Sequence, residues 1–138
     1  MPRRLHVLLV EDDELTALNT RRALRRSPAV AAITLATDGR DALDRLQRGD
    51  LPAERLVVVT DLSMPRMAGL ELVAAIRLDP TLADLLVAVL TTSNDEADRA
   101  GASALRVAAY FVKAGVAPLD ELVAWLGSCQ SVDRLARP

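Results

Sequence analysis

The chain has 138 residues, of which 51% are hydrophobic, and its formal net charge is −2. This length and composition predict one domain with a substantial core, and the absence of a basic stripe argues against nucleic-acid binding. One cysteine (Cys129) and one histidine (His6) exclude an internal disulfide and a Cys/His metal site. No apolar stretch is long enough for a membrane span or a signal peptide, so we expect a cytoplasmic protein without a membrane partner.

Apolar runs of strand length alternate with helical patterns along the chain. We expect strands at 5–10, 33–36, 56–60, 85–90 and 108–113, and helices at 14–26, 40–48, 69–78, 95–105 and 119–126. Alternating elements with almost continuously apolar strands are typical of a parallel sheet covered by helices on both faces. The sequence therefore predicts a three-layer α/β domain over residues 1–127, followed by a short polar tail at 128–138 with no output domain.

Two of these strands end in acidic residues. The first leads directly into Glu11 and Asp12, and the third delivers Asp61 into a turn rich in proline and glycine. Because the carboxyl ends of parallel strands meet at one edge of a sheet, the three carboxylates are expected to lie within reach of one another. They would repel each other unless a cation lay between them, and oxygen ligands alone favour Mg²⁺ or a similar hard ion.

The last two strands end in a hydroxyl and an amine. Thr91 follows the fourth strand and Lys113 ends the fifth, as the one lysine beside sixteen arginines. A lysine on its flexible stem can enter a small acidic pocket as a point charge. These groups suit phosphoryl transfer, with Asp61 as the nucleophile that becomes an aspartyl phosphate and with Lys113 and Thr91 as contacts for the phosphoryl oxygens. The metal ligands would be Asp12, Asp61, the backbone carbonyl of Ser63 and, through water, Glu11.

Four segments together resemble the response regulator receiver domain of two-component signalling. They are Val-Glu-Asp-Asp at 10–13, Asp-Leu-Ser-Met-Pro-Arg-Met-Ala-Gly at 61–69, Leu-Thr-Thr-Ser at 90–93 and Tyr-Phe-Val-Lys at 110–113, and the resemblance spans about residues 5–126. It implies a flavodoxin-like (βα)5 fold with sheet order 2-1-3-4-5. It also implies that Asp61 receives a phosphoryl group from a histidine kinase or a histidine phosphotransfer protein. The chain looks most like small single-domain regulators, some of which partner phytochrome-type kinases.

In this family a threonine and an aromatic residue form a switch, and the matching positions are Thr91 and Tyr110. A phosphoryl group adds negative charge and strong acceptor oxygens that can draw the Thr91 hydroxyl inward. Tyr110 would then fill the vacated space, although it could equally be an ordinary aromatic that packs against the helix at 95–105. The family's positions that tune phosphoryl hydrolysis are Ser63 and Ser93, both small and neutral, so we predict neither strong shielding nor a built-in base.

The sequence departs from the family pattern at the end of the last strand. The family lysine is usually followed by a proline in a cis peptide, whereas Ala114 stands here. A cis bond to a residue other than proline costs about 2.5 to 4 kcal/mol, so we predict a trans bond and a different path for the loop at 114–118. Arg106 also stands near a position where the family commonly has glycine, and Gly101 lies inside the preceding helix.

Partner surfaces are predicted from helical periodicity. If Ala17, Thr20 and Leu24 face the sheet, then Leu15 and Leu18 are exposed apolar residues beside the acidic site and, with Arg22, are suited to docking a kinase helix. The alternative is that Leu15 and Leu18 belong to the core. Trp125 is either half-buried core or part of a dimer face, and the protein is expected to be a monomer or a homodimer through 95–105, 108–113 and 119–126.

Three functions are compatible with these motifs. The leading one is a phosphoacceptor that signals by contact with a downstream protein and is no enzyme beyond accepting and hydrolysing its own phosphoryl group. The second is a pseudo-receiver adaptor that phosphate does not switch. The third is a haloacid-dehalogenase-like phosphatase, which the sequence disfavours because that family needs a second aspartate where Ser63 stands.

Overall fold

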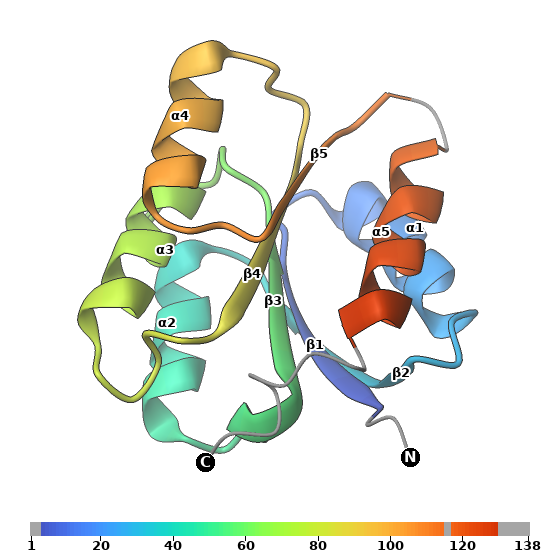
Figure 1. The fold of residues 1–138 in the computed structure, drawn as a ribbon, viewed down its shortest axis with the longest axis horizontal. Helices are drawn as coiled ribbons and strands as arrows, with labels where there is room; N and C mark the ends of the chain where they lie inside the picture. The colour runs from blue at the N-terminus through green and yellow to red at the C-terminus, as the bar shows by residue number, and fades with distance from the viewer. Residues whose placement is uncertain (1–3, 115–116, 130–138) are drawn as a thin grey trace.

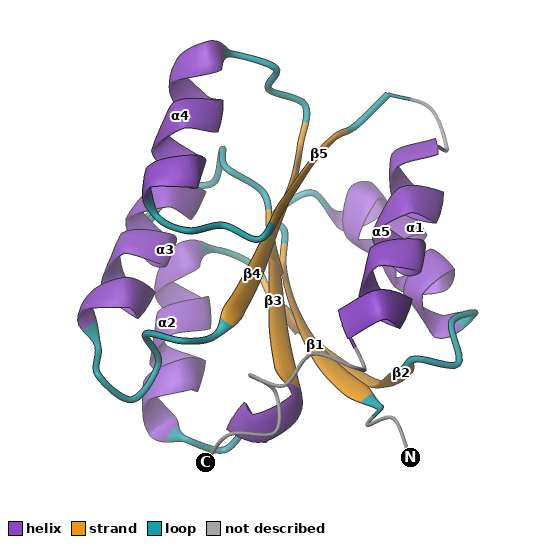
Figure 2. Cartoon of the chain, viewed as in Figure 1, coloured by secondary structure: helices purple, strands orange, loops and turns teal. Residues whose placement is uncertain are grey.

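A computed structural model describes residues 4–114 and 117–129. In chain order the elements are β1 (Leu5–Val10), α1 (Glu14–Arg25), β2 (Val30–Ala36), α2 (Gly39–Arg48), a short 3-10 helix (Ala53–Arg55), β3 (Leu56–Thr60), α3 (Gly69–Leu78), β4 (Leu86–Thr91), α4 (Glu96–Ala104), β5 (Ala109–Val112) and α5 (Ala117–Cys129). The strands form one parallel sheet in the order β2-β1-β3-β4-β5 (Figures 1 and 2). This confirms the predicted flavodoxin-like (βα)5 fold.

The sheet separates two apolar cores. Helices α1 and α5 cover one face, and α2, α3 and α4 cover the other (Figure 1). Side chains alternate along each central strand, so Val7 and Leu9 of β1 pack toward α5 residue Leu122, while Leu8 and Val10 pack toward α3 residue Leu72. Because both faces are covered, both sets of side chains on β1 and β3 are apolar apart from His6 and Thr60.

Polar caps set where the helices begin. The Asp13 carboxylate accepts a hydrogen bond from the Thr16 amide at 2.8 Å at the start of α1, and the Asp38 carboxylate accepts one from the Asp41 amide at 2.7 Å at the start of α2. Each bond satisfies an amide that has no partner within the helix. Both caps directly follow strands, so they also fix the loops at the carboxyl edge of the sheet.

Two elements differ from the sequence prediction by more than one residue at an end. Strand β2 begins at Val30 instead of residue 33, because Val30 pairs with Leu5 of β1 although the alanines that follow it have little preference for strands. Helix α5 runs from Ala117 to Cys129 instead of 119–126: a proline is tolerated in the first turn, and burial of Cys129 extends the packed face. Of the predicted tail at 128–138, residues 130–138 lie outside the described part.

The exposed face of α1 is the one that carries Leu15 and Leu18. Ala17, Thr20 and Leu24 are buried, whereas Leu15 is 65% exposed and Leu18 is 42% exposed. The alternative that both leucines belong to the core is therefore wrong.

Trp125 on α5 packs into the core. It is half-buried, and its ring meets Phe111 of β5 edge-on with a centroid separation of 6.3 Å. Among residues 4–114 and 117–129, no helix has both the length and the apolar character needed to cross a membrane.

Candidate functional site

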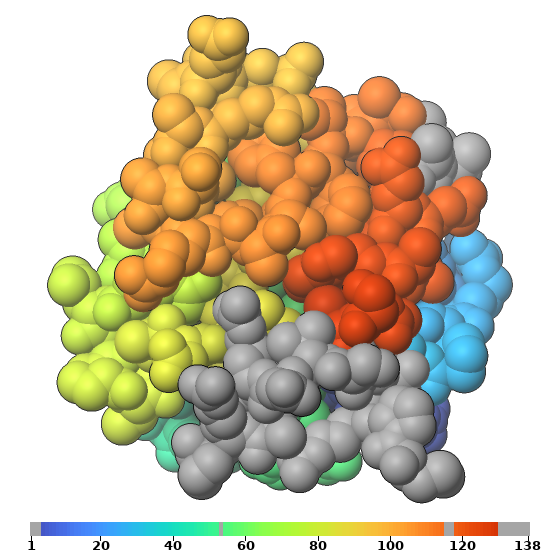
Figure 3. Space-filling view, viewed as in Figure 1, coloured from blue at the N-terminus to red at the C-terminus, as the bar shows by residue number. Residues whose placement is uncertain are grey.

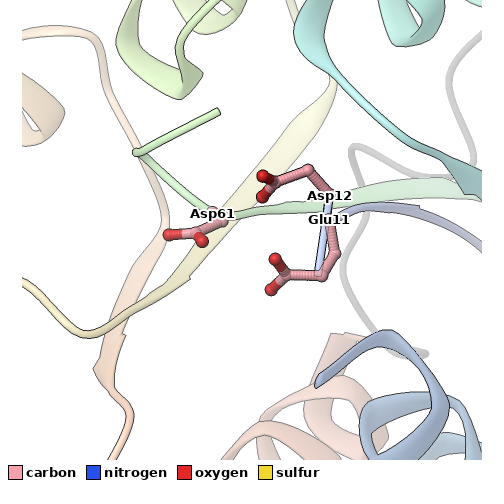
Figure 4. Close-up of side chains that lie close together, drawn as sticks. All are labelled: Glu11, Asp12 and Asp61. Carbon is pink, nitrogen blue, oxygen red and sulfur yellow. The ribbon is translucent and has the colours of Figure 1, made fainter. Parts of the chain in front are cut away.

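Three carboxylates meet at the carboxyl edge of the sheet. The Glu11 amide donates to the carbonyl of Ala36 at 3.0 Å, and the Asp61 amide donates to the carbonyl of Val10 at 3.1 Å, so the residues after β1 and β3 stay in register with their neighbours. One carboxylate oxygen from each of Glu11, Asp12 and Asp61 lies within 4.8 Å of the others. Figure 4 shows the side chains of Glu11 and Asp12 directed toward Asp61, as the sequence predicted.

Lys113 enters this cluster from the end of β5. Its Nζ lies 2.7 Å from Oε1 of Glu11 and 3.4 Å from Oδ2 of Asp61. The Lys113 amide donates to the carbonyl of Thr91 at 2.7 Å, which continues the pairing of β5 with β4 past the last strand residue. The bond to Ala114 is trans, as predicted. Lys113 thus reaches the acidic cluster without the proline that usually follows it in this family.

The cluster carries more negative than positive charge. Burial raises the pKa of Glu11, although the hydrogen bonds from Lys113 and from the Asp13 amide act in the opposite direction. The Lys113 ammonium contacts two of the three carboxylates, Glu11 and Asp61; Glu11 is buried, and the third, Asp12, is exposed. A set of oxygen donors with one side open to water fits a hard divalent cation that keeps some of its own water ligands.

The Asp61 side chain is partly exposed and firmly oriented. Its Oδ1 accepts a hydrogen bond from the Leu62 amide at 2.7 Å, and its Oδ2 faces Lys113. At the other end of the loop, the Gly69 amide donates to the Leu62 carbonyl at 2.9 Å. A Cβ atom at Gly69 would overlap the Asp61 carbonyl, so α3 can begin this close to Asp61 because residue 69 is glycine.

Thr91 ends β4, and Tyr110 lies within the neighbouring strand β5. Thr91 is buried, and its Oγ1 accepts a hydrogen bond from the Ser93 amide at 3.3 Å, so the hydroxyl proton can still be donated to another acceptor. The Tyr110 hydroxyl donates to the Ser93 carbonyl at 3.0 Å, and the Arg99 guanidinium of α4 stacks 4.6 Å from the centre of its ring. Tyr110 therefore contacts both α4 and the β4-α4 loop, and its role as a switch stays a prediction.

Ser93 itself is tied to α4, since its hydroxyl donates to Asp98 at 2.5 Å. Ser63 is exposed in the loop after Asp61. Sequence reasoning missed the ion pair between Asp38, at the start of α2, and Arg66 in this loop, whose carboxylate and guanidinium lie 3.4 Å apart. The available signal was the pair Asp38-Gly39, which marks a helix start but does not reveal what packs against it.

Beside the acidic cluster, α1 and the start of α5 border a shallow groove. Its volume is about 150 Å³, and its lining residues are Thr16, Asn19, Thr20, Leu90, Lys113, Pro118 and Leu119. The exposed residues Leu15, Leu18 and Arg22 lie on the outer side of the same helix. An apolar helix face therefore stands next to the groove that contains Lys113.

Comparisons with known proteins agree with this geometry. A family model described as the response regulator receiver domain matches residues 7–124. The probable methanogenesis regulatory protein FilR2 of Methanothrix harundinacea is 34% identical over 78% of this chain and 70% of its own length. The response regulator Rcp1 of Synechocystis sp. is 32% identical over 78% of this chain and 75% of its own.

Solved structures give the same result. The Mn²⁺-bound form of Rcp1 has a TM-score of 0.72 at 26% identity and covers 97% of both chains. The phosphorylated cyanobacterial phytochrome response regulator RcpA has a TM-score of 0.74 at 28% identity, over 92% of this chain and 91% of its own.

Receiver domains are signalling modules that are generally not enzymes, and they bind Mg²⁺ in an acidic pocket. Glu11, Asp12 and Asp61 form an acidic cluster of this kind at the carboxyl edge of the sheet. With a family match over most of its length and two relatives above 30% identity, the chain belongs to the response regulator receiver domain family of two-component signalling.

Proposed function

We propose that Asp61 accepts a phosphoryl group from a phosphohistidine of a histidine kinase or a histidine phosphotransfer protein. The observation that carries this proposal is the position of Lys113, whose Nζ lies 2.7 Å from Glu11 and 3.4 Å from Asp61 within a cluster of three carboxylates. A half-buried positive charge beside a partly exposed carboxylate is what a phosphoryl acceptor needs. The proposed site of action is the cytoplasm, where such kinases present their phosphohistidine.

In the transfer step, an Asp61 carboxylate oxygen attacks phosphorus in line with the bond to the donor nitrogen. The P–N bond breaks, the new P–O bond forms, and the donor imidazole leaves with the electron pair. The Leu62 amide holds Oδ1 of Asp61 at 2.7 Å, so the attacking group keeps its orientation. Lys113 is within reach to move from the carboxylates to a phosphoryl oxygen, and the Thr91 hydroxyl would meet another.

The proposed cation is Mg²⁺, which would neutralise charge on the phosphoryl oxygens when bound. Asp12, Asp61 and the Ser63 carbonyl would hold it directly, and Glu11 would act through water. The Mn²⁺-bound form of the relative Rcp1 supports a divalent cation in this family. A cation there would also offset the mutual repulsion of the three carboxylates.

The phosphorylated state would be transmitted through Thr91 and Tyr110. When Thr91 turns toward the phosphoryl group, its hydrogen bond with the Ser93 amide changes, and Ser93 in turn holds both Tyr110 and α4. The chemical change at Asp61 is thereby linked to α4 and β5. Figure 3 shows α4, β5 and α5 side by side on one face, which we propose as the contact surface for a downstream protein or a second copy.

The kinase or phosphotransfer protein would dock on α1. Leu15 and Leu18 are exposed apolar residues near the groove that contains Lys113, and Arg22 continues the same face. Burying them beneath a partner helix would favour association by the hydrophobic effect.

Incubation with acetyl phosphate and Mg²⁺, followed by intact mass measurement, tests this function. We expect a gain of one phosphoryl group in the native chain and none in Asp61→Asn, which keeps the size of the side chain. Asp44→Asn, on the exposed face of α2, is the matched control and should be modified like the native protein. If the native chain gains no mass with acetyl phosphate or with a phosphorylated kinase, the pseudo-receiver adaptor becomes the better description.

A further inference from the structure

The loop that follows Asp61 is tied to the start of α2. We propose that Asp38 and Arg66 are positioning residues that hold this loop so that the Ser63 carbonyl can bind the cation. This inference rests on the proposed function, because it concerns the same cation site. It adds two residues that lie outside the acidic cluster itself.

The loop has an unfavourable backbone conformation at Arg66. Its φ is 67°, and the Met67 amide donates to the Pro65 carbonyl at 2.7 Å across it, which makes a three-residue turn of the rare positive-φ kind. A residue with a Cβ atom adopts this conformation only at an energetic cost, so its surroundings must hold it there.

Asp38 supplies one of these contacts. Its side chain is 7% exposed, and both of its oxygens are used: Oδ1 accepts from the Asp41 amide at 2.7 Å, and Oδ2 lies 3.4 Å from Nε of Arg66. The first contact caps α2, and the second joins that helix to the loop. A buried carboxylate thus has its ion pair with a residue that adopts an unfavourable φ.

Gly39 supplies a second contact, between backbones. Its amide donates to the Met67 carbonyl at 3.1 Å. A Cβ atom at position 39 would overlap that carbonyl and the Met67 side chain, so the two segments are in direct contact. Together the two contacts fix residues 66 and 67 against α2.

The cation ligands differ in what holds them. Glu11, Asp12 and Asp61 follow buried strands, and the pairing of β1, β2 and β3 sets their positions. The Ser63 carbonyl belongs to the loop, three residues before Arg66, so its position depends on the contacts of Asp38 and Arg66. Loss of the ion pair should therefore weaken cation binding while the carboxylate cluster stays intact.

The decisive variant is Arg66→Gly, which relieves the unfavourable φ and removes the ion pair. Loss of this pair should cost little stability, because the Arg66 side chain is 62% exposed and Asp38 keeps its hydrogen bond from the Asp41 amide. A merely structural role predicts unchanged or greater thermal stability and unchanged cation binding. Our proposal predicts unchanged or greater stability together with a Kd for Mg²⁺ that rises about 10-fold, measured by calorimetry on the full chain without phosphodonor. Arg66→Lys, which keeps the positive charge, should restore binding to within about threefold of the native Kd.

Arg106→Gly is the matched control. Arg106 also has a positive φ, 59°, but lies between α4 and β5. The Arg106→Gly variant should be as stable as the native chain or more stable, because glycine relieves the positive φ, and it should bind Mg²⁺ with the native Kd. Equal Mg²⁺ affinity in Arg66→Gly and Arg106→Gly overturns the role of Arg66. If the native chain and Arg106→Gly both fail to bind Mg²⁺ or Mn²⁺, the proposed cation site is overturned instead, and the inference with it.

Discussion

Two regions of the sheet and its helices are built differently. Around Asp61, β3 is buried throughout and β1 is buried at every position except His6, so the strands that carry the acids are fixed by packing on both faces. Around Tyr110, every residue of β5 is only partly buried, and α4 has one buried residue, Ala102. Asp61, the proposed phosphoryl acceptor, thus follows strands that are packed on both faces, which we call the rigid side, whereas the proposed contact surface lies where less apolar surface is buried.

This difference in burial determines which part of the molecule can move more easily. Opening of a segment costs less free energy where less apolar surface is buried, so a modest change in contacts can shift α4 and β5 while β1 and β3 keep their positions. Polar contacts take the place of packing on that side. The guanidinium of Arg77, on α3, donates to the carbonyls of Leu105 and Arg106 after α4 and to those of Ala83 and Leu85 before β4.

The largest expected effect is that of Lys113→Ala, which removes the ion pair with Glu11 on the rigid side. Removal of the ammonium leaves the Glu11 carboxylate buried without its partner, which should lower the free energy of unfolding by about 3 kcal/mol at pH 8. Urea denaturation of the variant and the native chain measures this difference in the free energy of unfolding. The cost should shrink toward pH 5, because protonation of Glu11 removes the buried charge. Adding Glu11→Gln should recover most of the loss, and a double variant as unstable as Lys113→Ala would contradict this account.

A smaller and more local effect is expected on the other side, with Arg77→Met. The substitution keeps much of the apolar stem but removes the donors to four carbonyls, and we expect a loss of about 2 kcal/mol. Hydrogen exchange should accelerate strongly in α4 and at the start of β5. The amides of β1 and β3 should exchange faster only by the amount that the lower free energy of global unfolding explains. Uniform acceleration over the whole sheet would show that the two regions do not differ as described.

The sequence predicts the rigid side far better than the other. Apolar strands that end in Glu11, Asp12 and Asp61 leave few alternatives, because parallel topology alone brings their ends together. The position of Lys113 also follows from the strand order, even with Ala114 in place of proline. On the other side, the contacts of Tyr110 with Ser93 and Arg99 depend on side-chain orientations that periodicity does not encode.

The contacts that sequence reasoning missed could not be predicted for one physical reason. Asp38 and Arg66 are 28 positions apart and meet only because the loop after β3 folds back onto α2. Arg77 likewise binds carbonyls that lie in two different loops. Such contacts between side chains and loops follow from the assembled fold, whereas hydrophobic patterns report which face of an element is buried.

The smallest expected effect is that of His6, which lies near the amino end of β1. It concerns how the stability of the rigid side depends on pH. Burial, and then the charge of Arg55, lowers the pKa of His6 from 6.5, and its Nε2 lies 2.7 Å from the Thr34 hydroxyl. The unfolded chain therefore takes up the proton first, so the stability that neutral His6 provides is complete above pH 6.5 and is lost as the pH falls through that value toward the lowered pKa.

His6→Gln keeps a polar group opposite Thr34 without a titrating imidazole, and Glu11, whose raised pKa acts in the opposite direction, is common to both proteins. We expect the urea midpoint of the native chain to fall more between pH 7.5 and 5.8 than that of the variant. Hydrogen exchange should place the loss in β1 and β2, because these strands carry the His6 contact to Thr34. Equal pH dependence in both proteins, or a loss confined to α4, would show that the charge state of His6 does not matter to the rigid half of the sheet.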